Sequence, residues 1–211
     1  MNKFQSPKYS SIQSKILAQV IRTDAENTTD GERLLEGKKV NLRLAEKEGF
    51  PLLAEWVNRL EVFGEFNPVH QMSRTDFEKI FDGPHEEKWF IVEKKDGGKI
   101  GFVAHFYVLH PAGRQLEIGY SLLPNERGKG YCSEAAKILV DYLFLSKDIG
   151  RIQAQTDPRN LASQKVLEKA GFKREGTLRN SFFMRGERRD AYIYSILRKE
   201  WKEPRILTRT I

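Results

Sequence analysis

A loop with two closely spaced glycines constrains the fold of this chain more than any other feature of the sequence. The loop, 124–130, joins a strand-like stretch that ends at Leu122 to an apolar helical pattern that begins at Tyr131. At such a junction, free backbone N–H groups and the positive end of the helix dipole converge on one point. Gly128 and Gly130 have no Cβ, so the backbone can approach an anion closely. The pattern predicts a phosphate-binding loop, and a plain glycine-rich turn before an ordinary helix is the alternative.

Two familiar phosphate-binding motifs do not fit this loop. A dinucleotide-binding fingerprint requires a third glycine at the position where the chain has Ser133. A P-loop requires Ser or Thr after its lysine, but Gly130 follows Lys129. Arg127 and Lys129 still add positive charge beside the loop. We therefore expect an anion site of another class, suited to a diphosphate.

The remaining apolar patterns alternate between strands and helices along the chain. Period-two alternation and short apolar runs predict strands at 40–44, 89–93, 99–109, 115–122, 152–154, 172–178 and 190–197. Short turns at 96–98 and 111–113 indicate antiparallel hairpins. Helical spacing predicts helices after Pro51 and at 75–81, 131–144 and 161–169. The expected caps of these helices are Ser73, Asn160 and Gly171.

This order of elements predicts an α+β or mixed α/β fold. We expect a central, mostly antiparallel, twisted sheet of about seven strands with helices on both faces. The length of 211 residues fits a single domain with an extension. Residues 1–36 are polar and are expected to form an N-terminal arm, with a short helix around 11–22. Residues 37–211 are expected to form the folded domain.

Composition and charge limit the classes of partner and the cellular compartment that we expect for this protein. The formal net charge of +7 favours an anionic partner, such as a phosphorylated cofactor or a nucleic acid. Aromatic–basic RNA motifs and known DNA-binding elements are not recognised in the sequence, so we expect no specific nucleic acid. The single cysteine, Cys132, favours a cytoplasmic protein, and no membrane span or signal peptide is expected. The spacing of the four histidines does not suggest a metal site.

A second motif follows the next expected strand and completes a recognisable pattern. It comprises Asn160, Ser163, the pair Glu168-Lys169 and the pair Gly171-Phe172. Ahead of it stand Glu117-Ile118-Gly119-Tyr120, Pro124, the glycine loop and Glu134-Ala135. Together these motifs, within residues 38–200, resemble the GNAT superfamily of acetyl-CoA-dependent N-acetyltransferases. Trp56 and Asn58 resemble residues that are typical of the Rim-type branch, which includes ribosomal-protein-alanine acetyltransferases. Asn125 departs from the pattern, since the family's loop usually opens with Gln or Arg.

The resemblance implies a GNAT-like domain that moves an acetyl group from acetyl-CoA to a primary amine by direct attack. Backbone groups of Leu122 and Leu123 would bind the pantetheine arm. The diphosphate would lie on the loop residues Arg127, Gly128, Lys129, Gly130, Tyr131, Cys132 and Ser133. Ser163 would hydrogen-bond the departing thiolate, and Asn160 would contact the pantetheine arm. The plainer alternatives are that Ser163 is an ordinary first-turn serine and that Asn160 only caps its helix.

Acid–base chemistry at the acetyl group points to Glu117. An amine attacks a thioester only when it is neutral, so a general base matters most for a basic amine. Glu117 lies on the strand beside the expected thioester and is the best candidate, with a plain ion pair as the alternative. Tyr120 and Tyr131 are either acids or packing residues. Cys132 is expected to be a small packing residue rather than an acetylated intermediate.

The sequence leaves the acceptor open. In the family the acceptor lies between the first two helices and the last hairpin, here 59–73 and 179–190. Glu61 and Glu65 in the first segment could steer an amine. The second carries Arg179, Arg185, Arg188 and Arg189, which suit an acidic partner or an ordinary solvated hairpin. We expect an amine-bearing small molecule or a protein N-terminus as acceptor. A non-catalytic acyl-CoA-binding sensor is the alternative function, and a homodimer is among the open oligomeric states.

Overall fold

The structure is a computed structural model, and it describes residues 34–69, 71–82, 87–110, 113–202, 204 and 206. The helix expected around 11–22 lies outside the described residues. No helix in the described part of the chain is long and apolar enough to cross a bilayer.

A mixed sheet forms the centre of the fold. Its eight strands, among the described residues, follow the order β1-β2-β3-β4-β5-β6-β8-β7. They are β1 (Leu34–Glu36), β2 (Val40–Leu44), β3 (Lys88–Lys94), β4 (Lys99–His110), β5 (Gly113–Leu122), β6 (Arg151–Thr156), β7 (Lys173–Met184) and β8 (Glu187–Leu197). Neighbouring strands are antiparallel except β5 and β6, which are parallel. The predicted fold class is confirmed, and the strand beyond the expected seven is β1, which lies within the segment expected to be an arm.

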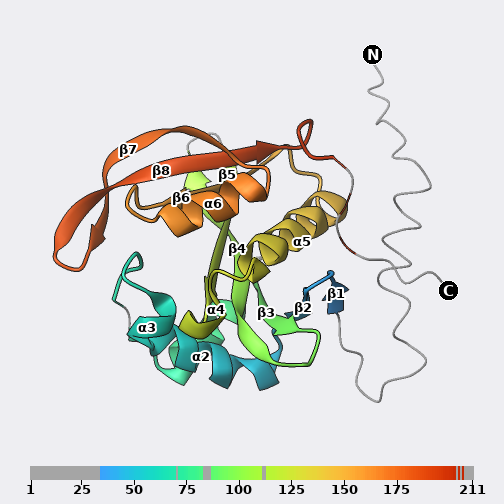
Figure 1. Ribbon diagram of the computed structural model, residues 1–211. Coiled ribbons are helices and arrows are strands. Elements are labelled where there is room, and N and C mark those ends of the chain that lie inside the picture. The colour runs from blue at the N-terminus through green and yellow to red at the C-terminus, as the bar shows by residue number, and fades with distance from the viewer. Residues whose placement is uncertain are drawn as a thin grey trace, which may run out of the picture.

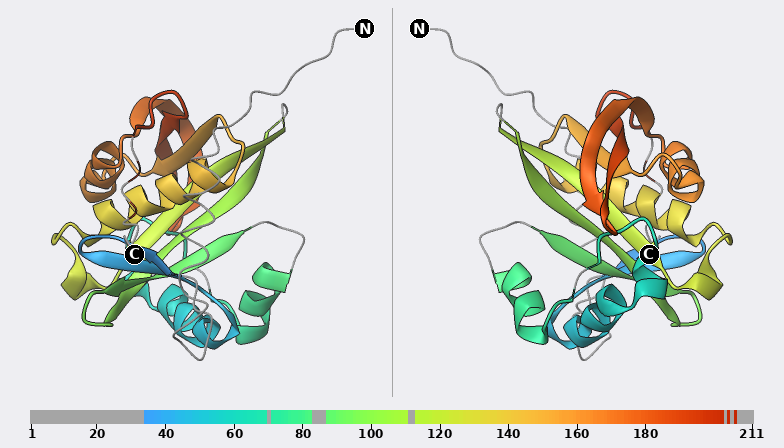
Figure 2. Two further views of the ribbon diagram at one scale, coloured as in Figure 1. Left: turned by 90° about the vertical axis from the view of Figure 1, so that its right-hand side faces the viewer. Right: turned by 90° about the vertical axis from the view of Figure 1, so that its left-hand side faces the viewer.

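Helices cover both faces of this sheet. They are α2 (Phe50–Asn58), α3 (Leu60–Phe63), α4 (Arg74–Asp82), α5 (Tyr131–Ser146) and α6 (Leu161–Lys169). Figure 1 and the two turned views of Figure 2 place α5 and α6 on one face, and α2 and α4 on the other. The first face buries a core that includes Ile118, Ile138 and Leu139. The second buries Leu53 and Phe77.

Local sequence signals explain where three of these helices begin or end. Pro51 lies in the first turn of α2, where its missing N–H and fixed φ are tolerated. The Ser73 hydroxyl accepts the Asp76 N–H at 3.1 Å and so caps α4 as predicted. After α6, Gly171 adopts a φ of 96°, a conformation that favours glycine directly beyond a helix end.

The last hairpin is longer than its apolar pattern predicted. The sequence indicated strands at 172–178 and 190–197, whereas β7 reaches Met184 and β8 begins at Glu187. β7 is an edge strand that is exposed over most of its length, so its outer half has no buried face and no period-two pattern. The register between the two strands shifts near Asn180, whose φ is 52°. Figure 1 shows the hairpin projecting beyond the rest of the sheet.

The sheet opens in its middle, between β5 and β6. These strands pair only at Leu116 with Ile152 and at Glu117 with Gln153. β5 nevertheless continues to Leu122, and β6 stays paired with β8 as far as Thr156. The two parallel strands therefore diverge, and none of the described strands lies beside the β6-facing edge of β5 beyond Glu117. This divergence agrees with the resemblance, which implied that β5 splays from its neighbour.

Candidate active site

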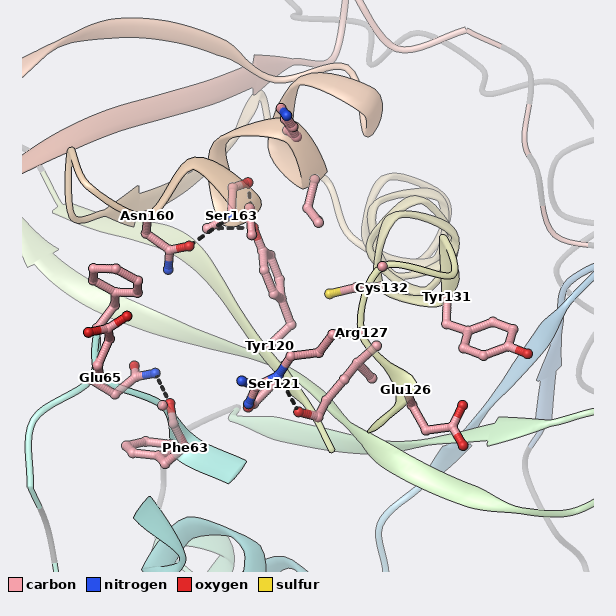
Figure 3. Close-up of a pocket in the computed structure, with 18 of the residues that line it drawn as sticks. Phe63, Glu65, Tyr120, Ser121, Glu126, Arg127, Tyr131, Cys132, Asn160 and Ser163 are labelled. Atoms are coloured by element: carbon pink, nitrogen blue, oxygen red, sulfur yellow. Dashed lines mark hydrogen bonds between the residues drawn. The ribbon is translucent and has the colours of Figure 1, made fainter. Parts of the chain in front are cut away.

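A cavity of about 710 Å³ lies at this divergence. One wall comes from the end of β5, the glycine loop and the start of α5, and a second comes from α6. The third wall is α3 together with the following residues up to Asn67. Figure 3 shows Tyr120, Cys132, Asn160 and Ser163 around this space, with Glu65 across it from Cys132. Segments far apart in the sequence thus meet where the strands separate.

The glycine loop leaves the beginning of α5 open to an anion. Gly128 and Gly130 have φ values of 79° and 85°, in the left-handed region that favours glycine. Gly130 is the N-cap of the 16-residue helix α5 and has no side chain that could satisfy its first N–H groups. Within the described part of the chain, the N–H groups from Gly128 to Ser133 donate to no backbone oxygen. Since helix N-termini with free N–H groups bind anions, the geometry supports the predicted phosphate loop.

The predicted loop residues are not equally placed around the cavity. Its lining includes Arg127, Gly128, Gly130, Tyr131, Cys132 and Ser133. Lys129 is not among the lining residues, and its ammonium pairs instead with Glu126 at 2.9 Å. The structure therefore brings all of the predicted loop together except the side chain of Lys129.

The end of β5 presents its backbone to the gap at alternate residues. The Leu123 N–H donates to Ile100 O at 2.9 Å, and Leu123 O accepts the Glu126 N–H at 2.9 Å. Leu123 is also not part of the lining, so the structure does not bring it to the site. Because strand backbone groups alternate in direction, the N–H groups of Leu122 and Tyr120 point away from β4 and toward the gap. Leu122 and Tyr120 both line the cavity.

Ser163 and Tyr120 form a hydrogen-bonded pair inside the cavity. Their hydroxyl oxygens lie 2.9 Å apart, and the Tyr120 hydroxyl also lies 3.2 Å from Ser163 O. Burial raises the pKa of Tyr120 well above its ordinary value, so this phenol stays protonated. When Tyr120 donates to Ser163 Oγ, the serine proton is free to point into the cavity. The pair can therefore present one hydroxyl proton to an atom bound there.

Asn160 both caps α6 and faces the same space. Its Oδ1 accepts the Ser163 N–H at 3.0 Å, which confirms the predicted cap. Figure 3 shows the side-chain amide directed toward the cavity, which Asn160 helps to line. The cap therefore leaves the Asn160 amide nitrogen facing the space beside Ser163.

Asp157 holds the turn before α6 and was missed in the sequence. It is 2% exposed, and its carboxylate accepts the Arg159 N–H at 2.8 Å and the Arg159 guanidinium at 2.9 Å. Arg189 of β8 approaches it at 3.4 Å. Burial alone would raise the pKa of Asp157, but hydrogen bonds from Arg159 and the charges of both arginines hold it below its ordinary value. The carboxylate thus ties the Asn160 turn to the last hairpin.

Glu117 lies on a different face of the sheet from Ser163. It is 8% exposed, and its Oε2 accepts the side-chain amides of Gln153 at 2.9 Å and Gln155 at 3.1 Å. Along β5 it shares a face with Ser121, whose hydroxyl donates to Val62 O beside α3. Glu117 is not part of the cavity lining, so the structure does not bring it into contact with Ser163. The side-chain hydrogen-bond partners of Glu117 in the described part of the chain are therefore two amides, whereas the alternative to a general base drawn from the sequence was an ion pair.

Cys132 lines the cavity at the start of α5. Burial raises the pKa of its thiol to about 12, although the charge of Arg127 opposes this shift. The thiol is therefore protonated near neutral pH and is a weak nucleophile. This supports the packing role expected for Cys132.

Several lining residues were not singled out from the sequence. On α6, Lys165 and Lys169 join Ser163 on the cavity side and add positive charge. The two lysines are four residues apart and so lie on one face of the helix, which is the signal that could have revealed them together. On the acceptor side, Asn67 lines the cavity, and Arg185 donates from the turn of the β7–β8 hairpin to Gly64 O at 3.2 Å. The expected acceptor segments, α3 with its following loop and the last hairpin, therefore do meet.

Comparison with known proteins gives this geometry a family. Residues 39–173 match the acetyltransferase (GNAT) domain. The uncharacterized N-acetyltransferase p20 of Bacillus licheniformis is 30% identical over 172 residues, which cover 78% of this chain and 96% of that protein. The spermidine N(1)-acetyltransferase of Escherichia coli K12 is 27% identical over 165 residues, which cover 77% of this chain and 88% of that protein.

A solved structure shares the fold. Mycobacterium smegmatis RimJ in complex with CoA-disulfide matches with a TM-score of 0.66 at 24% identity, over 82% of this chain and 90% of that chain. The matched family segment runs from the residue before β2 to the start of β7, and so includes the loop, α5 and α6 that form the cavity. The chain therefore belongs to the GNAT acetyltransferase family, is an acyltransferase, and has a Rim-type acetyltransferase among its structural relatives.

Proposed function

We propose that the protein transfers an acetyl group from acetyl-CoA to a primary amine by direct attack. The observation that carries this proposal is the cavity, which joins an open helix N-terminus to the unpaired edge of β5 and to the Ser163 hydroxyl. The first of these features suits a diphosphate, the second a pantetheine arm and the third a sulfur. A carrier thioester combines these three groups. The RimJ structure with bound CoA-disulfide supports the same ligand class.

The N–H groups of residues 128–133 hold the diphosphate in this proposal. Lys165 and Lys169 lie along α6, on another wall of the same cavity, and add charge attraction for the phosphates. The pantetheine amides pair with the backbone of β5 in the gap, and the Leu122 N–H meets the thioester oxygen. As the amine attacks, negative charge grows on that oxygen, so the N–H stabilises the transition state more than the ground state.

Proton transfers complete the reaction at both ends. The amine nitrogen attacks the carbonyl carbon, and the C–S bond breaks. The thiolate takes a proton from solvent through Ser163, which Tyr120 orients. The nitrogen gives up a proton through water to Glu117, which lies on the β5 face that carries Ser121 beside α3. Deprotonating an amine of pKa about 10.4 at pH 7 costs roughly 4–5 kcal/mol, against about 1.4 kcal/mol for a chain N-terminus. A base therefore contributes most when the acceptor is a basic amine.

The acceptor in this proposal enters between α3 and the β7–β8 hairpin. Glu65 and Asn67 line that side, and a carboxylate there suits a cationic amine. The E. coli relative is a spermidine acetyltransferase, and a protein N-terminus is the other acceptor that the Rim-type resemblance suggests. We place the reaction in the cytoplasm, which the single cysteine supports.

Release of free thiol from acetyl-CoA tests this function. The purified protein is incubated with acetyl-CoA and a panel of spermidine, spermine and peptides with free N-termini, and acetylated products are identified by mass spectrometry. Calorimetry on the same sample measures CoA affinity. Turnover with one acceptor class, reduced in Ser163→Ala but not in Arg114→Lys, is the expected result. CoA binding without turnover of any amine would favour the acyl-CoA sensor, and no CoA binding would refute both functions.

A further inference from the structure

The side chain of Arg127 donates hydrogen bonds to two separate elements of the fold. Its Nε donates to Leu122 O at the end of β5 at 2.9 Å. Its Nη2 donates to Glu61 O at 3.0 Å and to Val62 O at 2.8 Å, both in α3. The guanidinium therefore links the strand that borders the donor gap to the helix that borders the acceptor side.

The segment that Arg127 holds is weakly supported on its own. α3 contains four residues, and a helix of one turn is unstable in isolation. The carbonyls of Glu61 and Val62 lie at its C-terminal end, where no intrahelical partner follows. Besides Arg127, the Ser121 hydroxyl donates to Val62 O at 2.6 Å. A cation at a helix C-terminus is favourable, so Arg127 stabilises α3 through both hydrogen bonds and charge.

The same segment continues directly into the acceptor wall. Phe63, Gly64, Glu65 and Asn67 follow within one short stretch and line the cavity. Arg185 of the hairpin donates to Gly64 O at 3.2 Å, near the start of this stretch. Arg127 itself stands immediately before Gly128, where the N–H groups proposed to hold the diphosphate begin. The planar, forked guanidinium of Arg127 is thus the direct hydrogen-bonded link between this loop and α3.

We propose that Arg127 is a positioning residue that couples the donor loop to the acceptor wall, rather than a phosphate ligand. Ordering of residues 128–133 by the donor orders residues 60–67 through Arg127, so the donor improves acceptor binding. Linkage makes this coupling reciprocal, and an acceptor improves donor binding by the same factor. The inference rests on the proposed function, because it requires the donor to bind at the loop.

Three variants of the protein distinguish a coupling role of Arg127 from a general role in stability. Arg127→Lys keeps the charge but removes the fork, so one ammonium cannot reach all three carbonyls in the same geometry. Ser121→Ala removes the second tie to Val62 and leaves Arg127 in place. Arg114→Lys is the matched control, because Arg114 is an exposed arginine at the far end of β5. Thermal unfolding of each variant establishes that it is folded.

Hydrogen exchange with mass spectrometry, with and without CoA, gives the decisive readout. In the wild type, CoA is expected to slow exchange in 128–133, and also in 60–67 by about fivefold or more, within the usual range of coupling. Arg127→Lys should keep the first response and lose the second, Ser121→Ala should reduce the second only in part, and Arg114→Lys should keep both. In steady-state kinetics, Arg127→Lys should raise the acceptor KM while the Kd of acetyl-CoA stays within about threefold.

Each other outcome overturns a specific statement. If CoA protects 128–133 but leaves 60–67 unchanged in the wild type, or protects 60–67 equally in Arg127→Lys, the coupling is wrong. If Arg127→Lys weakens CoA binding tenfold or more with an unchanged acceptor KM, the guanidinium is a phosphate ligand. If CoA fails to protect 128–133 in the wild type, the donor site of the proposed function falls, and the coupling falls with it.

Discussion

Replacing Ser163 by alanine tests the chemistry of the cavity most directly. In the proposed reaction, the Ser163 hydroxyl donates to the sulfur as negative charge develops on it. A hydrogen bond to a charged group contributes about 1.5–3 kcal/mol. Ser163→Ala should therefore lower kcat by roughly 10- to 150-fold, at about 1.4 kcal/mol per tenfold. The Kd of CoA should change little, because the bond strengthens only as the C–S bond breaks.

Tyr120→Phe gives a smaller effect through the same proton. Its hydroxyl lies 2.9 Å from Ser163 Oγ, and a neutral hydrogen bond contributes about 0.5–1.5 kcal/mol. Tyr120→Phe should lower kcat by roughly 2- to 12-fold. If the phenol acts only by orienting Ser163, the double variant should be no slower than Ser163→Ala. The two effects are then non-additive, as for groups that act as a unit.

The assay is thiol release from acetyl-CoA at saturating acceptor, with CoA affinity measured by calorimetry on the same samples. Arg114→Lys serves as the control variant. A kcat for Ser163→Ala within twofold of the wild type would refute the role of its hydroxyl. A double variant whose loss equals the product of the two single losses would show that Tyr120 acts independently, as a separate acid.

Three further predictions concern the loop, the thiol and the turn before α6. Gly130→Ala places a side chain at a φ of 85°, which costs about 1–2 kcal/mol and should lower the unfolding midpoint by about 2–8 °C; an unchanged midpoint in calorimetry would contradict this strain. Because burial raises the pKa of Cys132 to about 12, iodoacetamide at pH 7.5 should alkylate it roughly a thousandfold more slowly than a free thiol. Mass spectrometry measures this rate, and a rate equal to that of glutathione would show an exposed thiolate. The folded-state pKa of Asp157 lies below its unfolded value, so its contribution to stability is present above the unfolded pKa and is lost as pH falls through the folded one. The difference in urea-unfolding free energy between wild type and Asp157→Asn should shrink as the pH is lowered below about 4, whereas a constant difference would contradict the shift.

Periodicity predicted the elements that bury a full face, and it failed where an element buries little. The helix that begins at Tyr131 and the strand that ends at Leu122 were located from the sequence because apolar side chains repeat along them. α3 has only Val62 buried, and β1 has only Leu35. A single buried residue leaves no period to detect, so both elements depend on partners supplied by the rest of the fold.

The candidate site divides along a similar line. The glycine loop and the Asn160–Ser163 turn were recognisable because their chemistry resides in backbone conformation and in residues close in sequence. The side-chain direction of Arg127 depends on carbonyls in α3, which no local pattern reveals. Glu117 was correctly placed on β5, but the partners that hold it come from β6. The sequence therefore did not predict the side-chain contacts between residues that are far apart along the chain.

The separation of β5 from β6 has a mechanical consequence. Since the two strands share only two register pairs, the sheet consists of two halves, β1–β5 and β6–β8, with few interstrand bonds between them. A pantetheine chain lying in the opening would act as a clasp that fastens one half to the other. Binding of the donor would then limit the motion of the two halves relative to each other. Release of CoA would restore that motion before the next turnover.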